Sequence, residues 1–186
     1  MPLLPASTAH ALLAALLIAA AVIDVRTRRI PNSLIVTGLV CAALAHALAV
    51  GSGAAPMAGP SWWSPLAGFT AGLLLMLPLH LLRAMGAGDV KLMAMVGAFV
   101  GAPAVLHATL YALLAGGVLS LFFMLGRGVA AGTLTNLRLM LPRLGPSSAS
   151  QAAIRSEPLQ RTAVRLPYAL PIAVGTGLAL VWPLGL

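Results

Sequence analysis

The sequence predicts an all-α membrane protein that crosses the bilayer about six times. Hydrophobic residues make up 60% of its 186 residues and charged residues only 8%, whereas a soluble domain carries roughly 25% charged residues to cover its surface. The mean hydropathy is +1.01. Aromatic residues are only 5% and show no β-barrel alternation. We therefore expect helices, which bond their backbone amides internally, to span the lipid.

Apolar runs of roughly 20 residues, the length that crosses a bilayer, define the expected spans. They cover residues 8–25, 33–50, 65–82, a short run from Asp89 to Gly101, 104–125 and 167–184. The short run rises only about 18 Å as a helix, so it crosses the bilayer only where the site is recessed or the membrane is thin. We treat residues 1–186 as one integral-membrane domain, with 126–166 as a basic loop that includes a surface helix near 134–141.

The positive charges fall on one side of this predicted topology. All eleven Lys and Arg residues lie in the segments 26–29, 83–91 and 126–166, which share one face if there are six spans. The positive-inside rule places that face in the cytoplasm, so both termini lie outside and the expected location is the bacterial inner membrane. Since these bases sit in loops between apolar runs, we do not interpret the net charge of +8 as a nucleic-acid surface.

Two of the three acidic residues occupy unusual positions. Glu157 lies in the basic loop and is interpreted as a solvated surface residue, but Asp24 closes the first span and Asp89 opens the fourth. Ionisable groups at membrane depth are costly and usually functional. Each aspartate alone has a simpler interpretation, because Asp89 suits a helix N-cap and Asp24 lies one turn from Arg28.

Taken together, the two carboxyls suit hydrolytic chemistry. Two neighbouring carboxylates cannot both ionise cheaply, so one keeps its proton. The ionised partner then activates water, and the protonated one donates to a peptide carbonyl. Gly86 and Gly88 beside Asp89 allow a sharp turn and a close approach of substrate. We expect neither a metal nor another cofactor, because the chain has one cysteine, Cys41, and its histidines show no HExxH pattern: His10, His46, His80 and His107.

Two segments resemble the motifs of a known protease family. Residues 86–92, Gly-Ala-Gly-Asp-Val-Lys-Leu, resemble the GxGDxKL signature of the type IV prepilin peptidases, which are membrane aspartyl proteases. Residues 24–32, from Asp24 to Asn32, resemble the family's other element, an aspartate followed by a hydrophobic-Pro-Asn sequence. Residues 165–171 resemble the proline-rich entry to the family's last helix.

The resemblance implies that Asp24 and Asp89 are the catalytic pair. Five further residues are implied to shape the backbone or contact the substrate: Gly86, Gly88, Lys91, Pro31 and Asn32. The implied substrate is a prepilin or pseudopilin whose basic leader is cut at the cytoplasmic face, just before its hydrophobic helix. The lipid bilayer and a pilus-assembly machinery are the other implied partners.

The chain departs from the long members of that family. Those members carry a cytoplasmic insert with four cysteines, a zinc site and an N-methyltransferase activity, whereas this chain has one cysteine and a short turn between its first two spans. It resembles the short Tad/Cpa-type branch, which processes Flp-type pilins.

Two other functions remain as alternatives. The first is a non-enzymatic scaffold of a pilus or secretion apparatus, or a protease relative that has lost activity, which only the intact aspartate pair disfavours. A small proton-coupled transporter would carry acids deep within its spans and an internal repeat, whereas these acids lie at span ends. Lys91 either anchors the fourth span at the headgroups, which we favour, or stabilises the ionised pair.

Overall fold

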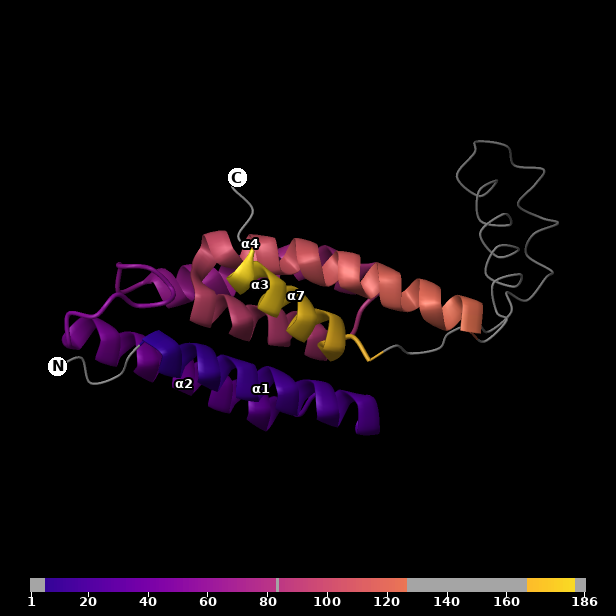
Figure 1. Cartoon of the computed structure of the whole chain (residues 1–186), viewed down its shortest axis with the longest axis horizontal. Coiled ribbons are helices and arrows are strands. Elements are labelled where there is room, and N and C mark those ends of the chain that lie inside the picture. Colours follow the sequence, from indigo (N-terminus) through magenta and orange to yellow (C-terminus); the bar gives the residue numbers. More distant parts are fainter. Residues whose placement is uncertain (1–5, 83, 127–166, 183–186) are drawn as a thin grey trace. The chain divides into compact units, whose positions relative to one another are not determined.

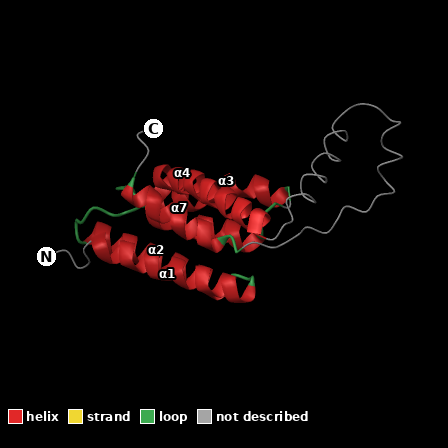
Figure 2. Ribbon diagram, turned by 45° about the vertical axis from the view of Figure 1, so that its right-hand side comes forward, coloured by secondary structure: helices red, strands yellow, loops and turns green. Residues whose placement is uncertain are grey.

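The computed structural model describes residues 6–82, 84–126 and 167–182 of the chain, and all regular elements among them are helices (Figures 1 and 2). Their bounds are α1 Ala6–Thr27, α2 Asn32–Gly51, α3 Ser64–Leu81, α4 Ala87–Gly126 and α7 Ala169–Val181. The all-α prediction is confirmed. The expected helix at 134–141 and Glu157 lie outside the described residues.

The chain divides into two units. The first unit comprises residues 1–117 and 167–186 and holds most of the described chain. The second unit comprises residues 118–166, of which the structure describes only the end of α4. Four described helices are long and apolar enough to cross a membrane: residues Thr8–Thr27, Asn32–Gly51, Ser64–Leu81 and Ala87–Phe123. The chain is therefore a multi-pass membrane protein. The helix α7 is shorter, with 13 residues.

The helix α4 is broken at Gly101, where φ is 82° and ψ is 171°. Only glycine adopts such a conformation without strain. Gly97 and Val105 would lie about 12 Å apart along a continuous helix, yet a Cβ built on Gly97 would be 3.2 Å from Val105 Cγ2. The chain therefore folds back at this point (Figure 1). We call residues 87–100 the first leg of α4, and the second leg begins at residue 102.

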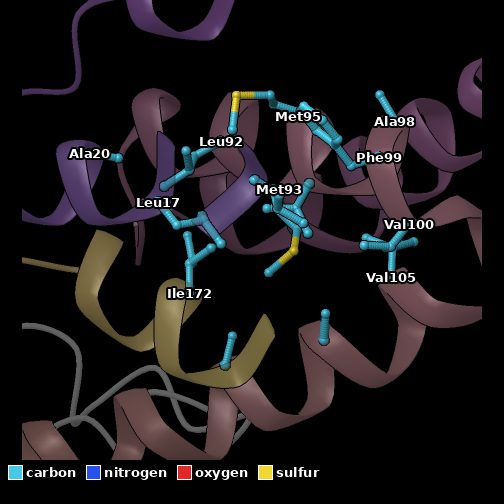
Figure 3. Packing of buried hydrophobic residues seen from close by; sticks show 14 of the residues in the cluster. Leu17, Ala20, Leu92, Met93, Met95, Ala98, Phe99, Val100, Val105 and Ile172 are labelled. Atoms are coloured by element: carbon cyan, nitrogen blue, oxygen red, sulfur yellow. The ribbon is translucent and has the colours of Figure 1, made fainter. Parts of the chain in front are cut away.

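The first leg lies at the centre of the helix bundle. Every residue from Leu92 to Val100 is buried, as expected for a helix that is apolar on all sides. Figure 3 shows Leu92 and Met93 beside Leu17 of α1 and Ile172 of α7, all members of one buried cluster. This explains how so short an apolar run is accommodated, because protein rather than lipid encloses it.

Glycines bring α3 against the first leg of α4. A Cβ on Gly68 would overlap the carbonyl oxygen of Gly97, and a Cβ on Gly72 would lie 2.5 Å from the carbonyl oxygen of Met93. Small residues permit such close helix packing inside membranes, where it is a main source of association. On the other side of the bundle, α1 packs against α2 and α7. These contacts position the end of α1 and the start of α4.

Candidate active site

Asp24 lies in the last turn of α1 and is only 6% exposed. Its Oδ2 accepts a hydrogen bond from the backbone N–H of Ala169, at 3.2 Å. Ala169 is the first residue of α7, so the carboxyl group faces the positive end of that helix. The sequence suggested Arg28 as a local partner for this carboxyl. In the structure, the N–H of Arg28 instead donates to the backbone carbonyl of Asp24, at 2.8 Å.

The first turn of α7 is suited to holding an anion. The first four N–H groups of a helix, counted from the N-cap, lack intrahelical acceptors. The N–H of Ile172 is the first to close a turn, onto the carbonyl of the N-cap Tyr168 at 3.2 Å. Pro171 has no N–H to satisfy. Ala169 therefore supplies a first-turn N–H that Asp24 accepts.

Asp89 lies in the first turn of α4. Its Oδ2 accepts a hydrogen bond from the N–H of Gly86, at 3.2 Å, and its own N–H donates to the carbonyl of Gly86, also at 3.2 Å. An acidic side chain that reaches back to the residue before the helix is one half of a capping box. The prediction that Asp89 is the N-cap is therefore wrong: Asp89 is the third residue of α4, and Gly86 directly precedes the helix.

The fold brings the two aspartates together. The negative charge of Asp24 acts on Asp89, although 65 positions separate the two residues in the sequence. Each carboxyl group also lies at the N-terminal end of a helix, α7 for Asp24 and α4 for Asp89. The helix ends partly offset the mutual repulsion of the acids.

The other residues predicted for the site join the two motifs. Lys91 Nζ donates to Asn32 Oδ1 at 3.1 Å, which links the first leg of α4 to the first residue of α2. A Cβ on Gly88 would lie 3.3 Å from Ile30 Cβ, so these residues pack closely. Pro31 is the N-cap of α2, in an extended conformation. Lys91 therefore makes a contact that neither headgroup anchoring nor support of the acids predicted.

The comparison with known families agrees with this arrangement. The model of the type IV leader peptidase family matches residues 11–121, a range that includes both aspartates and more than half of the chain. The chain belongs to the type IV leader peptidase family. No curated protein and no solved structure matches it significantly. The resemblance inferred from the motifs is confirmed, and membership implies that the protein is a peptidase.

Tyr168 is a residue of the peptidase site that the sequence did not single out. It directly precedes Ala169, and its phenol lies within electrostatic range of Asp89. A Cβ on Gly116 would be 2.7 Å from Tyr168 Cζ, so the ring rests on the backbone of α4 at this glycine. The signal in the sequence was that Tyr168 lies within residues 165–171, the segment that resembles the entry to the family's last helix.

His80 supports the loop that leads to Asp89. Its Nδ1 lies 3.1 Å from the carbonyl oxygen of Met85, so that nitrogen carries the proton of the hydrogen bond. This contact fixes the backbone one residue before Gly86. The peptidase thus holds Asp89 from both sides, through His80 before the turn and through Lys91 after it.

Proposed function

We propose that this peptidase is an aspartic endopeptidase that removes the leader of a prepilin or pseudopilin at the cytoplasmic face of the bacterial inner membrane. The observation that supports this most directly is that Asp24 and Asp89 each lie at a helix N-terminus and that Asp89 lies within electrostatic range of Asp24. Pairs of carboxyls in this relationship divide the roles of acid and base between them.

The proposed reaction needs one proton on the pair. The ionised carboxyl takes a proton from a water molecule, whose oxygen attacks the carbon of the scissile peptide. The protonated carboxyl donates its proton to the carbonyl oxygen, which gives a neutral tetrahedral diol. When this intermediate collapses, one diol hydroxyl returns its proton to the ionised carboxyl, the protonated carboxyl gives its proton to the amine, and the C–N bond breaks, so that one shared proton again remains on the pair.

The proposed topology has six crossings, with the two legs of α4 counted separately. Both aspartates then lie on the side of the three basic segments, which the positive-inside rule assigns to the cytoplasm. The connection from α1 to α2 comprises residues 28–31, too few for a zinc-binding insert. We therefore propose the short Tad/Cpa-type branch and Flp-type pilins as substrates, with a pilus-assembly machinery as the destination of the product.

The test is cleavage of a co-expressed Flp-type prepilin by the wild type and by the variants Asp24→Asn and Asp89→Asn. Each variant should remain in the membrane at the wild-type level and should leave the prepilin uncut, because an amide neither activates water nor shares the proton. Near-normal processing by either variant would disprove the pairing. A membrane-inserted wild type that processes no prepilin would favour the scaffold function.

A conservative change sharpens this test. Asp→Glu at either position keeps the charge but moves the carboxyl group by roughly 1.5 Å, and misplacement by about 1 Å costs about a hundredfold in rate. Chelators should leave the activity intact. Inhibition by a chelator that zinc reverses would point to a metalloenzyme instead.

A further inference from the structure

A second feature of the unit that contains the aspartates is an apolar cavity of about 740 Å³ between α2 and α3. Its walls come from the second half of α2, the Trp62–Trp63 pair and the start of α3. Its lining is apolar except for His46. Both tryptophans are exposed, as expected for side chains at a membrane interface.

The cavity and the candidate active site share two helices, α2 and α4. Its floor includes Ala98, a buried residue of the first leg of α4 that lies nine positions after Asp89, or about 14 Å along the helix. Its nearest wall residue on α2 is Leu39, which lies about 10 Å beyond Asn32. An occupant of the cavity would therefore lie along the same helix that carries Asp89.

The α2 wall has the form of a helix-docking face. The residues Ala43, Ala47 and Gly51 line the cavity at four-residue intervals, which places them on one side of α2. Small residues at this spacing let a second helix approach closely within a membrane. The larger side chains Leu66 and Phe69 form part of the α3 wall. This combination suits an apolar helix.

His46 is the only ionisable side chain among the described residues that line the cavity. It is 9% exposed and lines the cavity, and its Nε2 lies 3.1 Å from the carbonyl oxygen of Ser61. The carbonyl can only accept, so Nε2 carries the proton and Nδ1 is an acceptor. Nδ1 is buried and has no hydrogen-bond partner, although buried polar groups are nearly always satisfied.

We propose that this cavity receives the hydrophobic helix of the substrate, which enters sideways from the bilayer between α2 and α3. The inference rests on the proposed function, in which that helix directly follows the cleaved bond. A helix seated on Ala43, Ala47 and Gly51 runs beside the first leg of α4. Its cytoplasmic end then lies toward Asp24 and Asp89, where the scissile bond must be.

The first experiment fills the cavity. Ala47→Trp places a large side chain inside it, and Leu44→Trp places the same side chain on an exposed position of α2 that does not line the cavity. The probes are a full-length Flp-type prepilin and a soluble peptide that spans its cleavage site but lacks the hydrophobic helix. Ala47→Trp should lower kcat/KM for the full-length prepilin by at least about tenfold and leave the peptide rate unchanged, and Leu44→Trp should alter neither.

A second measurement keeps the inference testable if Ala47→Trp fails to insert or if the peptide is cut too slowly. A photo-crosslinking amino acid at position 43 or at position 44, in the Asp89→Asn background, should capture the full-length prepilin from position 43 only. Capture of lipid alone at position 43, or equal capture from both positions, would overturn the docking inference. Prepilin cleavage by the wild type, alongside either result, would leave the proposed function intact.

Discussion

The carboxyl group of Asp24 is held by the backbone N–H of Ala169, 145 positions away in the chain. The contact joins the last turn of α1 to the first turn of α7, two helices that pack along each other. The donor belongs to the backbone, so the side chain of residue 169 is chemically irrelevant to it. The integrity of the site therefore depends on where α7 begins.

Replacing Ala169 by proline should abolish most of the activity. Proline has no N–H, so Asp24 loses this donor, and an error of about 1 Å in its position would cost about a hundredfold in rate. Leu170→Pro is the matched control, because it also introduces proline into the first turn of α7 but leaves the Ala169 N–H intact. Prepilin cleavage and the thermal midpoint in detergent would be measured for both. Equal loss of activity at equal midpoints would show that the hydrogen bond is unimportant.

Loss of the hydrogen bond from Lys91 to Asn32 should slow cleavage but change stability little. Both side chains are exposed, so its loss should cost no more than about 1 kcal/mol of unfolding free energy. Lys91→Met and Asn32→Ala should each slow cleavage, because the start of α2 is no longer tied to the helix that carries Asp89. The double variant should be no slower than the worse single variant.

The control for that pair is Lys91→Arg, which keeps the positive charge. If Lys91 only anchors α4 at the headgroups, Lys91→Arg should be fully active and Asn32→Ala should have no effect. Additive losses in the double variant would likewise contradict the linkage. The arginine fork and the lysine point charge differ in geometry, so we expect Lys91→Arg to restore the rate only in part.

The helices of this fold could be predicted because a long apolar run that spans a bilayer must form a helix, which bonds its backbone amides internally. The helix α2 was expected at 33–50 and is observed at Asn32–Gly51, whereas α1 begins two residues earlier than expected, at Ala6, and α7 ends three residues earlier, at Val181. These differences concern helix ends, where capping rather than hydropathy decides. The break at Gly101 was signalled by a glycine followed closely by Pro103.

The site was predictable only in part. The scarcity of acids drew attention to Asp24 and Asp89, and the motif singled out Gly86, whose backbone N–H binds Asp89. Nothing in the sequence marked the backbone N–H of Ala169 as the partner of Asp24. Tyr168 reaches the site because α7 packs on α1. That contact depends on tertiary packing, which no local pattern encodes.

Two adjacent glycines in α4 allow a matched test of Tyr168. A Cβ on Gly116 would meet the Tyr168 ring, with Cζ at 2.7 Å, whereas a Cβ on Gly117 has nothing within 4 Å. Gly116→Ala should therefore displace the ring and, through Ala169, slow cleavage. Gly117→Ala should leave both activity and thermal midpoint unchanged. Gly116→Ala should lower the thermal midpoint less in a Tyr168→Ala background, where the ring is absent. If the decrease in midpoint is the same in that background, contact with the ring does not cause it.

The close packing of α3 against the first leg of α4 should contribute strongly to the free energy of unfolding. A Cβ on Gly68 would overlap the carbonyl oxygen of Gly97, and two backbones cannot yield as a flexible side chain does. Gly68→Ala should therefore lower the unfolding free energy by at least about 2 kcal/mol, and cleavage should fall with it because the same leg carries Asp89. Gly177→Ala is the control, since its Cβ meets nothing within 4 Å and should change stability by less than about 0.5 kcal/mol. Equal midpoints for the two variants would mean that α3 and α4 do not pack this closely.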